Sequence, residues 1–142
     1  MKKTSLLTIL SLLITFFVKA QDITHGTWFN EKKTAKIQFY KQGEKLYGKI
    51  VWLKEPNENG KPRLDKNNPD AKLKTKPLMG LVFLTGFTKD GDKEWEDGNI
   101  YDPENGKTYS CKMTITSPTT IDARGYIGIS LIGRTTKFTK AD

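Results

Sequence analysis

The sequence predicts an all-β protein: a small antiparallel eight-stranded barrel with one long loop that carries a short helix. Three observations support this prediction. About eight short segments alternate apolar and polar residues with a period of two, which is the pattern of half-buried strands. Turn-forming residues at 41–44, 89–92, 102–106 and 117–119 separate many of these segments, as expected of hairpins. The chain shows neither an alternation of strands with helices nor an internal repeat.

The predicted strands are short and follow one another closely. The first begins at Trp28, and in the third Ile50 and Trp52 share one face. Residues 80–88 are apolar on both faces, which is typical of a strand covered on both sides. Eight strands joined mostly by hairpins fit a barrel or a sandwich. The strands predicted after Trp28 cover 36–40, 46–52, 80–88, 93–101, 107–115, 119–124 and 128–138.

One region departs from the strand pattern. Residues 54–76 are polar and contain several prolines. A connection of this length inside a small domain is usually functional, ordered by its own elements, or disordered. We expect it to form a flap across the open end of the barrel, with Leu73 docking the flap against the rim. An ordered connector with no part in ligand access is the alternative.

A short helix is expected inside this flap, over residues 68–74. Asn68 is a favourable N-cap, and Pro69 suits the first helical position. Asp70 in the first turn and the lysines near the end complement the helix dipole. These features predict a helix start at Asn68.

The N-terminus has the features of a secretory signal peptide. Lys2 and Lys3 precede an apolar run over 6–18, which is too short for a membrane span. Small or apolar residues before the expected cleavage point after Ala20 suit a signal peptidase. A single membrane anchor is the alternative. We therefore predict a signal peptide at 1–20 and one barrel domain at 21–142, located in the periplasm or outside the cell.

The chain is basic, with a formal net charge of +8 at pH 7. Removal of the signal peptide takes away Lys2, Lys3 and Lys19 and leaves +5. Residues 31–76 hold 13 basic and 6 acidic residues, whereas 77–106 hold 2 and 7. A basic chain can have an anionic lipid or a nucleic acid as its partner. Because the lysines are dispersed and are not interleaved with aromatic residues, the pattern favours a solvated surface over both.

No catalytic group, cofactor site or metal site is indicated, and we expect a protein that is not an enzyme. Cys111 alternates with polar neighbours and is expected to point inward as a structural thiol. His25 is the only histidine, so a zinc cluster or a catalytic triad lacks further members. The carboxylates between Asp90 and Glu104 match no EF-hand loop, and a solvated surface is expected there, with cation binding left open.

Three separated motifs lie at 65–70 with 76–80, at 95–103 with 106–109, and at 124–128 with 133–134. Together they resemble a bacterial family known as domain of unknown function 2147. The resemblance covers nearly all of the chain after the signal peptide. It implies a lipocalin-like fold and a location in the cell envelope. The family has no established activity, so the resemblance implies no reaction or substrate. Lys74 and Lys76 stand where arginines are common in the family, which weakens a prediction of bidentate anion binding there.

Gly26, Trp28 and Arg134 are expected to form the closed end of a lipocalin-like barrel. Gly26 lets the chain pass close to the barrel floor, and Trp28 packs beneath the core. Arg134 is expected to stack on the indole ring of Trp28, with Arg124 as the competing partner.

Two functional hypotheses follow. The first is a secreted or periplasmic protein that binds a small, mostly apolar ligand or lipid, since inward-facing apolar side chains wall such sites. The second is an envelope protein-interaction module with a filled, non-binding barrel, since the charge division suits electrostatic steering of a partner. The residues expected to line a ligand site are Phe39, Ile50, Trp52, Phe83, Tyr109 and Met113.

Overall fold

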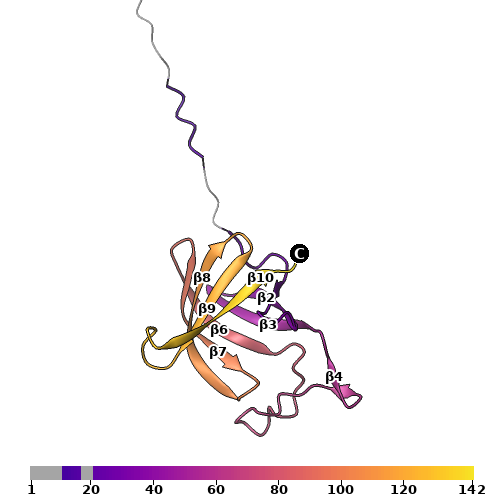
Figure 1. Ribbon diagram of the computed structural model, residues 1–142. Coiled ribbons are helices and arrows are strands. Elements are labelled where there is room, and N and C mark those ends of the chain that lie inside the picture. The colour runs from indigo at the N-terminus through magenta and orange to yellow at the C-terminus, as the bar shows by residue number, and fades with distance from the viewer. Residues whose placement is uncertain (1–10, 17–20) are drawn as a thin grey trace, which may run out of the picture.

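Eight strands close into an antiparallel barrel (Figure 1). Along the strands the side chains alternate between the interior and the outer face, as in β2. The computed structural model describes residues 11–16 and 21–142. Most of the predicted signal peptide and its cleavage point lie outside these residues. Around the barrel the strands follow the order β1-β10-β9-β8-β7-β6-β3-β2. Their bounds are β1 (Trp28–Phe29), β2 (Ala35–Gln42), β3 (Lys45–Leu53), β6 (Val82–Asp90), β7 (Glu94–Asp102), β8 (Lys107–Ser117), β9 (Thr120–Tyr126) and β10 (Gly133–Lys140).

The predicted all-β fold and eight-stranded antiparallel barrel are confirmed, but the last strand is shorter than expected. The sequence pattern predicted a strand over 128–138, whereas β10 begins only at Gly133. Because Gly133 pairs with Tyr126, residues 127–132 form the loop between β9 and β10. Gly128 has a φ of 81°, which interrupts extended backbone at that point. The apolar residues of this loop are therefore not part of the barrel wall.

The long connection between β3 and β6 contains a small hairpin and no helix. β4 (Asn57–Glu58) pairs with β5 (Lys61–Pro62). Their turn residues, Asn59 and Gly60, both have positive φ, as a two-residue Asn-Gly turn requires.

The predicted helix at 68–74 is wrong. The Asn68 side-chain oxygen accepts a hydrogen bond from the Asp70 backbone nitrogen at 2.9 Å, and Asp70 accepts one from the Lys72 nitrogen at 3.0 Å. The first bond is one that an N-cap also makes, but the second forms a side-chain turn inside the expected helix and competes with helical bonds. Leu73 is 42% exposed, so the segment has no buried apolar side chain of its own to support so short a helix.

The hydrophobic core fills one half of the barrel. Trp28, Phe39, Phe138 and Phe83 form a row of edge-to-face contacts, with successive ring centroids 6.2, 6.1 and 6.5 Å apart. Cys111 points inward as expected, and burial raises the pKa of its thiol to about 12. The buried cluster comprises Ile23, Trp28, Ile37, Phe39, Leu46, Leu84, Phe87, Trp95, Cys111, Met113, Ile115, Ile121, Ala123 and Phe138.

Trp28 closes the barrel at the end where the two termini of the fold meet. Its indole nitrogen donates to the Ile23 carbonyl at 3.0 Å, and the Lys140 ammonium lies 4.7 Å from the ring centroid. Gly26 has a φ of 72°, and a Cβ there would lie 2.8 Å from an Asp142 carboxylate oxygen. The positive φ and the close approach of Asp142 together explain why position 26 is a glycine.

The predicted stacking of Arg134 or Arg124 on Trp28 is wrong. The register pairs Trp28 with Lys140, so Lys140 supplies the cation. Arg134 precedes Lys140 by six positions on β10, which is about 20 Å of extended chain. It therefore lies at the opposite end of the barrel.

Within residues 11–16 and 21–142, no helix is long and apolar enough to cross a membrane.

Candidate ligand cavity

The barrel is hollow at the end opposite Trp28, where a cavity of about 400 Å³ opens. Small side chains cause this hollow: Ala35, Ala123 and Gly125 face the interior, where the closed half has large aromatic rings. The two rings of the aromatic row farthest from Trp28, Phe138 and Phe83, form part of the cavity wall. The apolar wall comprises Ala35, Ile37, Ile50, Phe83, Ile100, Ala123, Gly125 and Phe138.

The mouth of the cavity is polar and comes mainly from the β1–β2 loop and the β7–β8 turn. Lys32 lies 3.9 Å from Glu104 across the mouth. Arg134 makes no side-chain hydrogen bond or salt bridge with the residues that the structure describes, so its charge is available to an anion. The polar lining residues are Asn30, Glu31, Lys32, Tyr101, Asp102, Glu104, Asn105, Tyr109, Arg134 and Thr136.

Of the six residues expected to line a ligand site, three line this cavity: Ile50, Phe83 and Tyr109. Phe39 and Met113 point inward as well, but they are fully buried in the filled half. The barrel is therefore filled only in its closed half, and the expectation of a completely filled barrel does not hold for the open half.

Trp52 lies outside the barrel, so its expected place in the ligand site is wrong. Ile37 pairs with Ile50 but Lys36 pairs with Trp52, which leaves Val51 as an extra residue in β3. Such a β-bulge interrupts the alternation of side chains between the two faces. Trp52 consequently packs edge-to-face on Phe29 with a centroid distance of 6.2 Å and is 38% exposed.

Sequence reasoning missed most of the cavity wall, including Ile37, Ile100, Ala123 and Phe138. One signal was present in the sequence. Ala123 lies near the end of the strand predicted over 119–124, and Gly125 follows two positions later on the same face of β9. Two small residues on one inward face leave space in a barrel of this size.

The connection between β3 and β6 is tied to the barrel through Asp65, which is 1% exposed. Its carboxylate accepts hydrogen bonds from the Tyr101 hydroxyl at 2.6 Å and from the Asn68 side-chain nitrogen at 2.8 Å. The Asn67 side chain donates to the carbonyls of Pro103 and Glu104 at 3.0 and 3.1 Å. These contacts hold the connection against the β7–β8 turn.

The expected flap across the open end is not seen. None of residues 54–81 is part of the cavity lining. Of the residues proposed for the lid, Asn68 is buried beside Asp65, while Pro69, Asp70 and Leu73 are exposed. Leu73 does not dock on the rim, because the hydrogen bonds of Asp65 and Asn67 place the connection beside the mouth.

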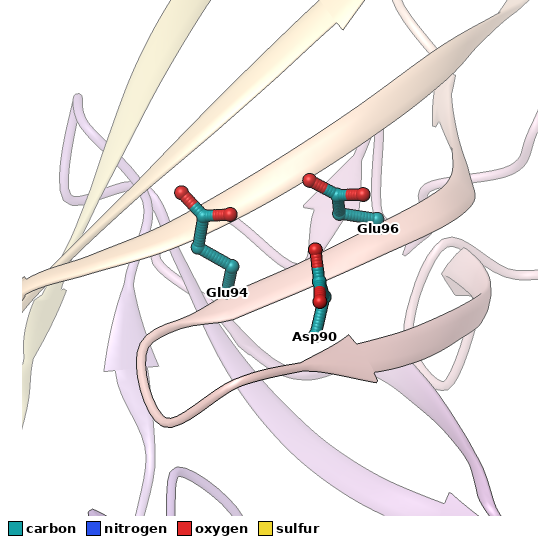
Figure 2. Close-up of side chains that lie close together, drawn as sticks. All are labelled: Asp90, Glu94 and Glu96. Carbon is teal, nitrogen blue, oxygen red and sulfur yellow. The ribbon is translucent and has the colours of Figure 1, made fainter.

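Part of the acidic run forms a cluster of three carboxylates on the barrel wall. Asp90, Glu94 and Glu96 each offer an oxygen, and these oxygens lie within 4.8 Å of one another (Figure 2). The Lys112 ammonium lies 3.5 Å from Glu94 and 3.3 Å from Glu96, and these two carboxylates raise its pKa. Lys112 thus supplies positive charge to two of the three groups.

A closed eight-stranded antiparallel barrel with a cavity at one end is the arrangement of a lipocalin-like fold. A solved structure with this fold is protein HP1028 from the human pathogen Helicobacter pylori, which is described as belonging to the lipocalin family. It matches with a TM-score of 0.74 and 21% sequence identity over 86% of this chain and 84% of that chain.

The chain belongs to the family DUF2147, described as an uncharacterized protein conserved in bacteria, which matches residues 26–140. The expected family membership is confirmed. No curated protein matches the chain.

Proposed function

We propose that this protein binds a small, mostly apolar molecule in the barrel cavity. The observation that carries the proposal is a cavity of about 400 Å³ with an apolar wall and a polar mouth. Small-molecule sites are commonly about 300–1,000 Å³ in volume and combine apolar walls with a few placed polar groups. The description of HP1028 as a lipocalin supports the same class of function.

Arg134 offers a place for an anionic end of the ligand, although the lining as a whole has three carboxylates and two cations. The charge of Lys32 is shared with Glu104, whereas Arg134 has no carboxylate partner within the described residues. A guanidinium group binds a carboxylate or phosphate through two parallel hydrogen bonds. The ligand class that combines an apolar body with such a group is a fatty acid or a related lipid.

The location is part of the proposal. The charged residues Lys2 and Lys3 and the apolar run at 6–18 support export to the periplasm or beyond. In an aqueous compartment, binding of a lipid chain against the apolar wall of the cavity is favourable because the chain leaves water.

Native mass spectrometry and calorimetric titration with medium-chain and long-chain fatty acids test the proposal. The protein to use is the chain from Gln21 onward, which contains every strand that the structure describes. We expect a complex with one ligand per chain. Arg134→Gln should weaken binding of a fatty acid more than binding of the corresponding alcohol, since only the acid pairs with the guanidinium group.

Two substitutions that fill the cavity give the decisive comparison. Ala123→Phe places a ring in the cavity, and Ile100→Phe does so at a partly exposed wall position if the first variant does not fold. Trp52→Phe on the outer face is the matched control. The proposal fails if no fatty acid binds, or if both filled variants bind as well as the wild type.

A further inference from the structure

The loop between β9 and β10 exposes an unusual amount of apolar surface. Ile127, Ile129, Leu131 and Ile132 are 74%, 58%, 85% and 74% exposed, respectively. Figure 1 shows this loop projecting from the barrel. Single exposed aliphatic residues are ordinary, whereas four within six positions form a patch that is typical of an interaction site.

The loop is held in shape by a neighbouring arginine. The Arg124 guanidinium donates hydrogen bonds to the carbonyls of Ser130 at 2.6 Å and Leu131 at 3.3 Å, and to the Thr135 hydroxyl at 3.0 Å. A backbone bond from Ile132 to the Ile129 carbonyl at 3.2 Å closes a turn at the tip. The structure therefore presents the aliphatic side chains on an ordered backbone.

The position of the loop links it to the cavity. Gly125 in β9 and Arg134 in β10 both line the cavity, and the loop joins these two strands just beyond them. Tyr126 is half-buried at the base of the loop. Tyrosine at the boundary between apolar and polar surroundings is typical of contact with a membrane interface.

Charge divides along the barrel axis. The segments at the open end (30–34, 54–81, 102–107 and 124–134) hold 12 basic and 7 acidic residues, a net charge of +5. The segments at the closed end (21–28, 41–45, 89–94, 116–120 and 140–142) hold 5 basic and 6 acidic residues, a net charge of −1. The exposed apolar loop thus lies at the basic end of the molecule.

We propose that the open end docks on an anionic lipid bilayer, with the loop 127–132 inserted among the lipid headgroups and the lysines of the 54–81 connection facing anionic phosphates. Membrane-surface binding combines buried apolar area with electrostatic attraction to anionic lipid, and this end carries both. Docking would bring the cavity mouth to the membrane, where an amphipathic ligand resides. The docking itself does not require an occupied cavity.

A second copy of the chain fits the loop less well. A symmetric contact through the loop would bring two ends of net charge +5 together, and like charges in close contact are repulsive. A bilayer that contains phosphatidylglycerol has the opposite charge. Charge complementarity therefore selects the membrane as the occupant.

Vesicle flotation tests the proposal, with ligand-free protein and two vesicle types: phosphatidylcholine alone, and phosphatidylcholine mixed with phosphatidylglycerol. We expect binding to the mixed vesicles that weakens with added salt. Leu131→Ser combined with Ile132→Ser should reduce this binding by about tenfold or more, because two aliphatic side chains no longer leave water. Trp52→Ser combined with Val82→Ser is the control, since both residues are exposed on barrel strands, outside the loop and outside the 54–81 connection.

Charge variants separate the electrostatic contribution to vesicle binding from the contribution of the aliphatic side chains. Replacing Lys72, Lys74 and Lys76 by Gln should weaken binding strongly, while the same change at the closed-end residues Lys41, Lys45 and Lys89 should have little effect. Leu131→Trp should show quenching of its fluorescence by brominated lipids, which reports insertion directly.

Three results would overturn the inference. The first is that the protein does not bind the anionic vesicles, and the second is that the Leu131/Ile132 variant binds them as well as the wild type. The third is that light scattering shows a dimer for the wild type and a monomer for this variant. The last result would assign the loop to self-association. Because no ligand is present, these results are independent of whether the cavity binds a fatty acid.

Discussion

The hydroxyl of Tyr101 donates a hydrogen bond of 2.6 Å to the carboxylate of Asp65, and this contact joins the long β3–β6 connection to the barrel wall. Asp65 is almost fully buried, and its second carboxylate oxygen accepts a bond from Asn68. A buried carboxylate is stable only when its oxygens have such partners. The pair therefore explains how a connection without a helix is ordered beside the cavity mouth.

Tyr101→Phe should release this connection. The substitution leaves one oxygen of a buried carboxylate without its donor. We expect the free energy of unfolding, measured by urea titration, to fall by about 1–3 kcal/mol. Amide hydrogen exchange should accelerate over 63–78 more than in the strands. Tyr126→Phe is the control, because the Tyr126 hydroxyl forms no hydrogen bond within the described residues. Unchanged stability and unchanged exchange in Tyr101→Phe would contradict the tethering role.

Alkaline pH should weaken the same contact. Burial and the hydrogen bond to Asp65 raise the pKa of Tyr101 from 10.0 to about 12. The folded protein therefore keeps a proton that the unfolded chain has already lost. The stabilisation by Tyr101 is complete below pH 10 and is lost as the pH rises to about 12.

Thermal melts of the wild type and of Tyr101→Phe across this pH range measure the effect. The difference in melting temperature between the two proteins should shrink from neutral pH to pH 12. The thiol of Cys111, whose pKa is also raised, is present in both proteins and so cancels from the difference. A constant difference across the range would contradict the prediction.

Gly106→Ala should detach the connection from the β7–β8 turn. Gly106 has a φ of 73°, and a Cβ at this position would lie 2.0 Å from the backbone oxygen of Asn67. The strain and the clash together should cost roughly 1–3 kcal/mol in chemical denaturation. Gly91→Ala is the matched control, since it has a φ of 74° with open space around its Cβ position. Equal losses in both variants would show that the contact with Asn67 contributes nothing.

Trp28→Ala should be the most destabilising single change at the closed end. Its ring is fully buried, packs on Phe39 and donates a hydrogen bond to the Ile23 carbonyl. Loss of this packing should cost about 3–5 kcal/mol in unfolding free energy. Trp52→Ala, which removes a partly exposed indole from the outer face, should cost far less. A thermal melt of Trp28→Ala equal to that of the wild type would refute the role of Trp28 in closing the barrel.

Much of the fold was predictable because its signals are local. Alternation in 109–115 indicated that Cys111 and Met113 point inward, and the structure buries both. The Asn59–Gly60 turn also had a local signal that points to a hairpin. The helix prediction at Asn68 failed because a cap residue marks a possible start, and only tertiary packing sustains a helix of this length.

By itself, the sequence determined the fold class, the turns that separate most strands, and the inward face of most strands, because side chains alternate with a period of two. Only the tertiary structure decided what those inward side chains enclose. Barrel closure placed Lys140 at Trp28 and Arg134 at the cavity mouth, and a single bulge at Val51 moved Trp52 to the outer face. The register of β9 with β10 likewise left residues 127–132 exposed. Register and closure depend on contacts between residues far apart in the chain, which local patterns do not encode.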